Sequence, residues 1–212
     1  MLARQTAQPL PQSDPILMMT SSVRARIAAT AFVLSAALPL TLGAQATGYR
    51  IDPSGRATTV VTLNRPAPAG AQRPAPAKIA IDYGQPHLRG RDVLTLIPLN
   101  SAWRLGANTS TSLTTDVDMV IGGATVPKGT YTLWVFRSEN GAKLVVNKQT
   151  GQWGTSYDAS QDLSRVDLRT KRLSQPLEAL QIALVPGQTG PTGVLRIVWG
   201  TVEYEVDWSV KQ

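Results

Sequence analysis

From residue 57 to the C-terminus the chain consists of short β-type segments separated by turn residues. This spacing constrains the possible folds more than any other feature of the sequence. The clearest pair is Thr130–Arg137 (TYTLWVFR) and Ala142–Asn147 (AKLVVN), joined by Ser-Glu-Asn-Gly, which predicts a hairpin. The other predicted strands are β-branched or alternate apolar and polar residues; they cover 57–63, 78–83, 112–115, 119–121, 165–173, 177–185, 193–199 and 201–210. No stretch after residue 47 keeps a helical period. The pattern predicts an all-β domain, a single antiparallel β-sandwich of jelly-roll or barrel-like form.

Two places in this region call for a special backbone. Residues 64–77 (NRPAPAGAQRPAPA) are rich in proline, which has no amide hydrogen to donate to a sheet. We therefore predict an extended surface loop at 64–77. Gly200 alone separates the last two predicted strands, which indicates a bend or a bulge.

The front of the chain has the organisation of an export sequence. Residues 19–26 form a short basic segment, and Ile27–Ala44 is an uncharged apolar stretch that ends in small residues. These are the parts of a secretory signal peptide, with cleavage expected after Ala44 or Ala46. A retained membrane anchor is the alternative, because the apolar stretch is close to the shortest length that spans a bilayer.

The predicted organisation follows from these patterns. It comprises a disordered preamble at 1–18 that translation from Met19 would omit, a signal peptide at 19–46, a leader at 47–56 and the β-sandwich domain at 57–210. The mature protein is expected in the periplasm or outside the cell, with no membrane span after cleavage. Its oligomeric state is left open.

Composition removes several chemistries. The chain has no cysteine and one histidine, His87, so disulfides, thiolate zinc sites, cysteine nucleophiles, a lipoprotein anchor and a Ser-His-Asp triad are not expected. We predict neither a metal site nor a cofactor. The formal net charge is +7, but the basic residues are scattered without interleaved aromatics, so nucleic acid is not an expected partner.

Several motifs, in a fixed order, resemble the hallmark stretches of a bacterial family known as domain of unknown function 2911. They are IDYGQP at 81–86, RGR at 89–91, WRLGAN at 103–108, IGG at 121–123, PKGTYTLW at 127–134, NK at 147–148 and GQWGTSY at 151–157. The resemblance covers about residues 57–210 and implies an exported protein whose activity is not established. Two positions depart from the family pattern: Thr109 replaces a usual acidic residue and Gln85 replaces a usual arginine. If either family residue is catalytic, this member is altered there.

The richest polar cluster combines Trp103, Arg104 and Asn108, next to Gly106. An arginine fork suits a carboxylate or phosphate, an asparagine both donates and accepts, and glycine permits close backbone approach. One hypothesis is an anion or sugar-like ligand held by Arg104 and Asn108, with Trp103 as a flat wall. The alternative is structural: Arg104 stacks on Trp103 and pairs with an aspartate, while Asn108 bonds loop backbone.

A second cluster lies in the connection that follows Asn147. Trp153 and Tyr157 sit between glycines and could form an aromatic platform, to which Lys148 would add a positive charge. The alternative is a loop plug, with Trp153 covering the end of the core.

The remaining carboxylates give weaker signals. Asp116 and Asp118 are spaced like calcium or acid-base ligands, but we favour ordinary turn aspartates. Asp82 and Asp92 flank the loop 83–91, and either could pair with Arg89, Arg91 or Arg104.

The sequence favours a non-enzymatic envelope module that binds a small polar ligand, a glycan or a protein. The candidate binding residues are Tyr83, Arg91, Trp103, Arg104, Asn108, Lys148, Trp153 and Tyr157. One alternative is a hydrolase or lyase that uses Asp and Arg. That function would be favoured if one pocket brought together Asp82, Arg91, Arg104, Asn108 and Lys148. A structural or assembly role is the other, and it predicts an exposed apolar patch or a free edge strand without a pocket.

Overall fold

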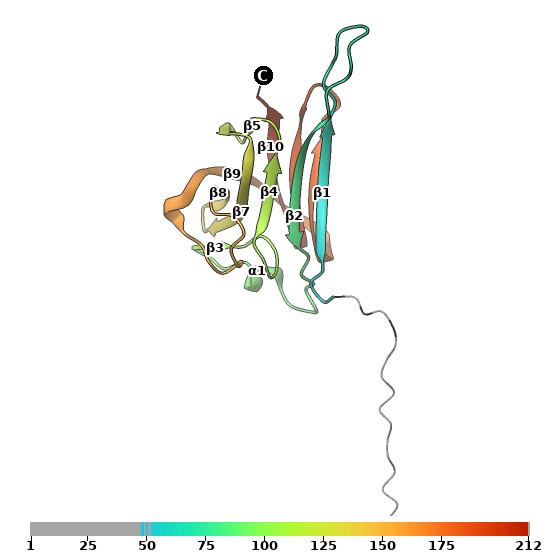
Figure 1. The fold of residues 1–212 in the computed structure, drawn as a ribbon. Coiled ribbons are helices and arrows are strands. Elements are labelled where there is room, and N and C mark those ends of the chain that lie inside the picture. The colour runs from blue at the N-terminus through green and yellow to red at the C-terminus, as the bar shows by residue number, and fades with distance from the viewer. Residues whose placement is uncertain (1–47, 49, 51, 212) are drawn as a thin grey trace, which may run out of the picture. The chain divides into compact units, whose positions relative to one another are not determined.

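The computed structural model describes residues 48, 50 and 52–211, so the predicted preamble and signal peptide lie outside the described residues. The described part is almost entirely β, which confirms the predicted all-β class (Figure 1). Its strands are β1 (Arg56–Leu63), β2 (Ala77–Gly84), β3 (Ser101–Trp103), β4 (Thr111–Thr115), β5 (Met119–Ile121), β6 (Ala124–Val126), β7 (Gly129–Ser138), β8 (Gly141–Asn147), β9 (Asp162–Pro186) and β10 (Thr192–Val210).

The strands form one antiparallel sheet in the order β1-β2-β4-β7-β8-β9-β10-β5-β6, with β3 paired to β7. The predicted β7–β8 hairpin is confirmed, with Ser138 opposite Gly141 at its end. The helical content is one turn, α1 (Val93–Leu96), and a 3-10 turn at Ala159–Gln161. Within the described residues, no helix combines the length and apolar character needed to cross a membrane.

The last two strands differ from the prediction of four separate ones. Segments 165–173 and 177–185 belong to one strand, β9, and segments 193–199 and 201–210 belong to β10. They stay paired as one ribbon, and register shifts around Gly200 replace a break in the chain. The bend expected at this glycine is present, with φ at 58°, a conformation that other residues adopt at a cost.

The bend in β10 is sharp. Residues seven apart on a straight strand are separated by about 23 Å. Yet the Nε of Arg196 donates to Oε1 of Glu203 across 2.6 Å, so the strand must fold back between them. Glu203 is buried and paired, as a charge in a protein interior requires.

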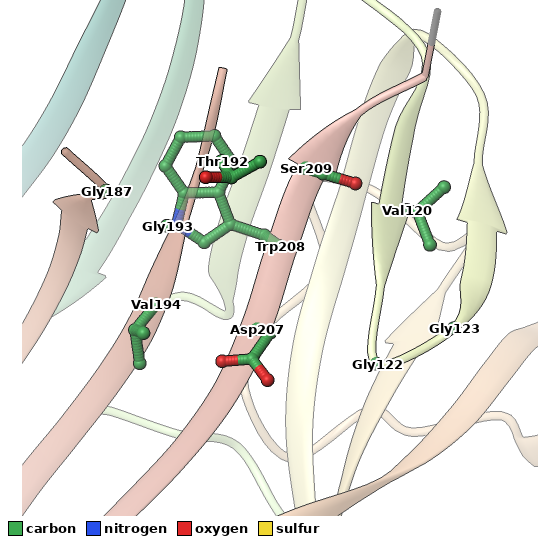
Figure 2. A pocket seen from close by; sticks show the side chains of 10 residues that line it. All are labelled: Val120, Gly122, Gly123, Gly187, Thr192, Gly193, Val194, Asp207, Trp208 and Ser209. Atoms are coloured by element: carbon green, nitrogen blue, oxygen red, sulfur yellow. The ribbon is translucent and has the colours of Figure 1, made fainter. Parts of the chain in front are cut away.

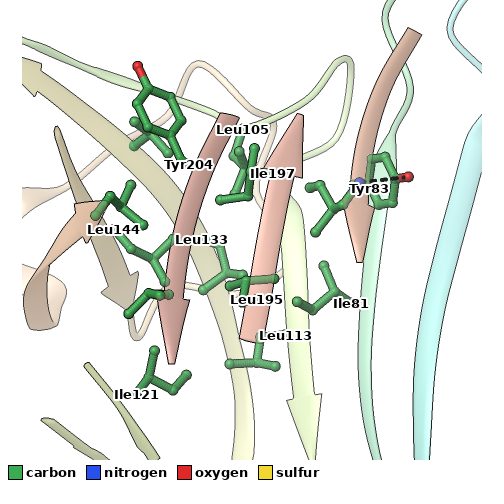
Figure 3. Packing of buried hydrophobic residues seen from close by; sticks show 14 of the residues in the cluster. Ile81, Tyr83, Leu105, Leu113, Ile121, Leu133, Leu144, Leu195, Ile197 and Tyr204 are labelled. Carbon is green, nitrogen blue, oxygen red and sulfur yellow. Dashed lines mark hydrogen bonds between the residues drawn. The ribbon is translucent and has the colours of Figure 1, made fainter. Parts of the chain in front are cut away.

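The folded ribbon closes the sheet against its first strands. Leu184 N donates to Thr59 Oγ1 across 3.3 Å, and Ile182 N donates to Tyr83 Oη across 3.1 Å. Tyr83 is thereby a buried structural residue of the core, and its dashed bond is drawn in Figure 3. The enclosed apolar core gathers side chains such as Ile81, Leu133 and Leu195 from strands distant in sequence (Figure 3).

The connection between β1 and β2, residues 64–76, is an extended loop that projects beyond the sheet, drawn in blue-green in Figure 1. Its side chains are exposed apart from a half-buried Ala67. The loop therefore adds little to the hydrophobic core.

Candidate functional site

A cavity of about 470 Å³ opens where α1, β3, β7 and the β8–β9 connection meet; we call it the aromatic pocket. Its volume is in the range of small-molecule sites, about 300–1,000 Å³. Its lining residues come from four separate segments: Leu96, Pro98, Ser101, Ala102, Trp103, Arg104, Trp134, Gly154, Thr155 and Tyr157.

Trp134 and Tyr157 give the pocket a rigid aromatic wall. Trp134 lies on the face of β7 opposite the core residues Leu133 and Val135, yet it is only 1% exposed. Its Nε1 donates to Thr132 Oγ1 across 3.2 Å, and its ring packs against Tyr157 with centroids 4.9 Å apart. Two neighbours therefore hold the indole ring in place.

The phenol of Tyr157 is held by two charged residues. Its Oη donates to Asp162 Oδ2 across 2.7 Å and accepts from Arg165 Nη2 across 3.0 Å. Partial burial and the hydrogen bond to Asp162 raise the pKa of Tyr157 to about 12. The hydroxyl is therefore neutral at physiological pH and its ring is fixed.

Arg104 supplies the only formal charge among the lining residues. Its Nε donates to Gly106 O across 3.2 Å. No carboxylate in the described part of the chain forms an ion pair with it, so the predicted structural pairing of Arg104 with an aspartate is wrong. A guanidinium without a counter-ion beside an aromatic wall suits an anionic ligand.

Trp103 has a structural and a lining role together. It is buried and stacks on Trp199, with centroids 5.5 Å apart and planes inclined by 10°. One ring face is therefore engaged by the core, while the residue also borders the aromatic pocket.

The backbone of the Trp103–Asn108 motif is tightly constrained. Leu105 and Asn108 have φ values of 48° and 62°, which are uncommon for residues other than glycine. A Cβ placed on Gly106 would lie 2.8 Å from Thr111 Oγ1 and 3.0 Å from Gly84 O. Gly106 thus permits close packing of the loop on β2 and β4, not the ligand approach that the sequence suggested.

Of the predicted site residues, Trp103, Arg104 and Tyr157 meet in the aromatic pocket. Asn108 does not line it; this exposed side chain makes a long hydrogen bond, 3.5 Å, to Ser54 O. Lys148 is also exposed and outside the lining.

Trp153 is 56% exposed and pairs through its backbone with Thr109. The prediction that it plugs the core is therefore wrong. The exposed ring lies next in sequence to Gly154 and Thr155, which line the pocket.

The side chain of Arg91 stabilises the loop that carries it. Its guanidinium donates to the carbonyl oxygens of Leu88 and His87, across 2.9 and 3.0 Å. His87 is half-buried, and its backbone pairs with Ala179 of β9.

The predicted pairing of Asp82 and Asp92 with Arg89, Arg91 or Arg104 is wrong. Asp82 accepts hydrogen bonds from Arg56 and Thr58 of the neighbouring strand β1. Asp92 instead caps α1, where its Oδ1 accepts from Leu94 N across 2.9 Å.

Asp116 and Asp118 act as ordinary structural aspartates, as predicted. They accept from Lys78 N and Lys128 N, each across 2.8 Å. The described residues contain no group of three or more His, Asp or Glu side chains placed to hold a metal ion.

Sequence reasoning missed two residues that build the site. Trp134 was read only as part of a strand, although its position on the face opposite Leu133 could have signalled an outer aromatic. Asn147 is fully buried, and its amide nitrogen donates to Asp158 O and Asp162 Oδ1, each across 2.8 Å. This asparagine fixes the connection that carries Tyr157.

A second cavity, of about 510 Å³, lies between the β5–β6 turn and the start and end of β10; we call it the glycine pocket (Figure 2). Its wall includes the backbone of Gly122, Gly123 and Gly193. Its charged group, Asp207, already accepts two hydrogen bonds from Arg169, each across 2.8 Å. None of the predicted site residues lines this pocket.

Fold and site together define a protein of one class: an antiparallel β domain closed by a folded terminal ribbon, with an aromatic pocket in its outer surface. The sequence model of the family described as "Protein of unknown function (DUF2911)" matches residues 66–208, and the chain belongs to this family. The family assignment made from the motifs is thereby confirmed. Searches of curated proteins and of solved structures gave no match.

Proposed function

We propose that this protein is an exported module that binds a small, carboxylate-bearing ring compound in the aromatic pocket. The observation that carries the proposal is Arg104, a guanidinium with no ion-pair partner among the described residues, next to the aromatic side chains of Trp134 and Tyr157. Export is supported by the basic, apolar and small-residue segments at 19–46.

The ligand class follows from the two parts of the pocket. One arginine fork matches the two oxygens of one carboxylate, with two parallel hydrogen bonds. Aromatic walls favour a ring whose flat or apolar face can pack on them. An acidic sugar or a ring-containing organic acid has both features.

The hydrolase or lyase alternative has less support. The residues whose convergence would favour it lie apart, since Asp82 is bound to Arg56 and Arg91 to its own loop. No lining residue of the aromatic pocket is a carboxylate or a histidine. Proton transfer would fall to Tyr157, whose raised pKa opposes ionisation at neutral pH.

A thermal-shift screen of the exported protein tests the proposal. The panel contains acidic sugars, ring-containing carboxylic acids, their methyl esters and neutral sugars. We expect stabilisation by one acid and at least a tenfold weaker Kd in Arg104→Ala, equivalent to about 1.4 kcal/mol. Arg104→Lys keeps the charge but loses the fork, and it should fall between the two.

Arg172→Ala is the matched control, because Arg172 is an exposed arginine of β9 outside the aromatic pocket. It should bind like the native protein. Equal weakening in Arg104→Ala and Arg172→Ala, or equal binding of acid and methyl ester, would refute the proposal.

A further inference from the structure

We propose that the loop between β1 and β2, residues 64–76, is a separate binding element that holds a phosphate group between Arg65 and Arg73. We call this segment the proline arm. The proposal does not depend on the aromatic pocket, because the two regions share no lining residue.

The proline arm is built from a duplicated segment. The pentapeptide Arg-Pro-Ala-Pro-Ala occurs at 65–69 and again at 73–77, with Gly-Ala-Gln between the copies. The strands leading into the arm end on the pair Leu63 and Ala77, and a turn closes its tip. The two arginines therefore lie on opposite limbs of the arm.

The limbs are stiff and contribute little to the core. Each copy carries two prolines, and each proline ring fixes its own φ. The arm projects beyond the sheet in Figure 1, and its side chains are exposed apart from a half-buried Ala67. A stiff segment loses less conformational entropy when it binds a ligand, which favours recognition over a purely connecting role.

The arm has an uncompensated positive charge. A groove of about 650 Å³ lies between the limbs, and Arg65 and Arg73 both line it. Residues 64–76 include no acidic residue. Neither arginine forms an ion pair with any residue that the structure describes.

Two arginine forks on one groove select the chemistry of the anion. Each fork donates two parallel hydrogen bonds to neighbouring oxygens. A carboxylate has two oxygens and is satisfied by one fork, whereas a phosphate monoester has three free oxygens and can serve both. The groove therefore fits a phosphate group with three free oxygens better than a carboxylate, whether the phosphate is free in solution or is the monoester headgroup of a lipid.

The test follows the arginine Nε–H signals of the full protein by NMR during titration with inorganic phosphate, and separately with acetate at equal ionic strength. We expect phosphate to shift the signals of Arg65 and Arg73 together, with one Kd. Arg65→Ala and Arg73→Ala should each weaken that Kd at least fivefold. Arg172→Ala, which removes the same charge from an exposed site on β9, should leave it unchanged.

A second measurement distinguishes the sources of phosphate. Sedimentation with phosphatidic acid vesicles, compared with phosphatidylcholine vesicles, reports binding to a phosphate monoester headgroup. Binding that needs both arm arginines supports the proposal, with vesicles alone indicating a headgroup and inorganic phosphate indicating a soluble ligand.

The proposal is overturned by equal affinity for acetate and phosphate, or by an Arg172→Ala effect as large as that of Arg65→Ala. It is also overturned if neither phosphate nor anionic vesicles bind. Thermal unfolding of each variant checks its fold, and these exposed substitutions should not shift the midpoint.

Discussion

The aromatic pocket and the glycine pocket have nearly the same volume, about 470 and 510 Å³, but they are built differently. Side chains form most of the first, and its charged residue, Arg104, has no described counter-ion. Backbone forms much of the second (Figure 2), and its charged residue, Asp207, already accepts two hydrogen bonds from Arg169. The size of a cavity therefore does not identify a binding site here; the state of its charged group does.

The largest expected effect is a difference in stability between substitutions in the two pockets, because one pocket is built from closely packed backbone and the other from side chains. A Cβ on Gly193 would lie 2.2 Å from Val185 O and 2.6 Å from the Trp208 ring, so Gly193→Ala should lower the free energy of unfolding by about 3 kcal/mol. Thr155→Ala, at the exposed rim of the aromatic pocket, should change it by less than about 0.5 kcal/mol. Urea unfolding measures both, and equal losses would contradict the difference in construction.

A smaller difference is expected between the tryptophans of the two pockets. Trp134 donates to Thr132 Oγ1, whereas the buried Nε1 of Trp208 has no hydrogen-bond partner in the described part of the protein. Trp134→Phe should therefore cost about 1 kcal/mol more than Trp208→Phe, since both remove the same ring volume but only one removes a hydrogen bond. Paired denaturant titrations give the difference, and a larger loss at Trp208 would show the comparison to be wrong.

The smallest effects concern pH, and they have opposite directions. Tyr157 has a folded pKa of about 12, above the ordinary value of about 10, so its stabilising contribution is lost as pH rises from about 10 to 12. Hydrogen bonds from Arg169 lower the pKa of Asp207, so its contribution is lost as pH falls below the ordinary aspartate range. Tyr157→Phe should flatten only the alkaline limb of the stability profile and Asp207→Asn only the acid limb.

Urea titrations across pH measure both limbs. Tyr131 and Tyr204 also have raised pKa values, so the difference between native protein and Tyr157→Phe isolates the contribution of Tyr157. An unchanged alkaline limb in that variant would contradict the assignment.

Local patterns predicted much of the fold. The alternation in 130–137 and 142–147 gave the β7–β8 hairpin, and the lone Gly200 gave the bend in β10. Strands β3 (SAW) and β6 (ATV) were missed because three residues are too few to show a period and, unlike the predicted strand 119–121 (MVI), neither consists of large apolar residues throughout. The continuity of β9 was missed because the strand runs on through residues 174–176, which read as a break; its pairing with β10 stops at Arg172 and resumes at Leu177.

The candidate site was predictable only in part. The motifs identified Trp103, Arg104 and Tyr157, because an arginine or an aromatic beside glycines stands out in sequence. Nothing local shows that Tyr157 packs on Trp134, since that contact depends on how the β8–β9 connection folds over β7. The ion pairs could not be predicted for the same reason. Asp82 pairs with Arg56, which is 26 residues away in sequence and becomes its neighbour only when β1 and β2 pair.

The folded terminal ribbon has a consequence for the order of assembly. Its contacts with the first strands, such as Leu184 with Thr59, join residues 125 positions apart. Contacts of such separation are slow to form and raise the contact order of the domain. As the chain emerges from its N-terminal end, β1 lacks these contacts until β9, residues 162–186, has followed. The domain therefore completes its fold only after β9 and β10 have emerged, and truncation of β10 should leave a chain prone to edge-to-edge association.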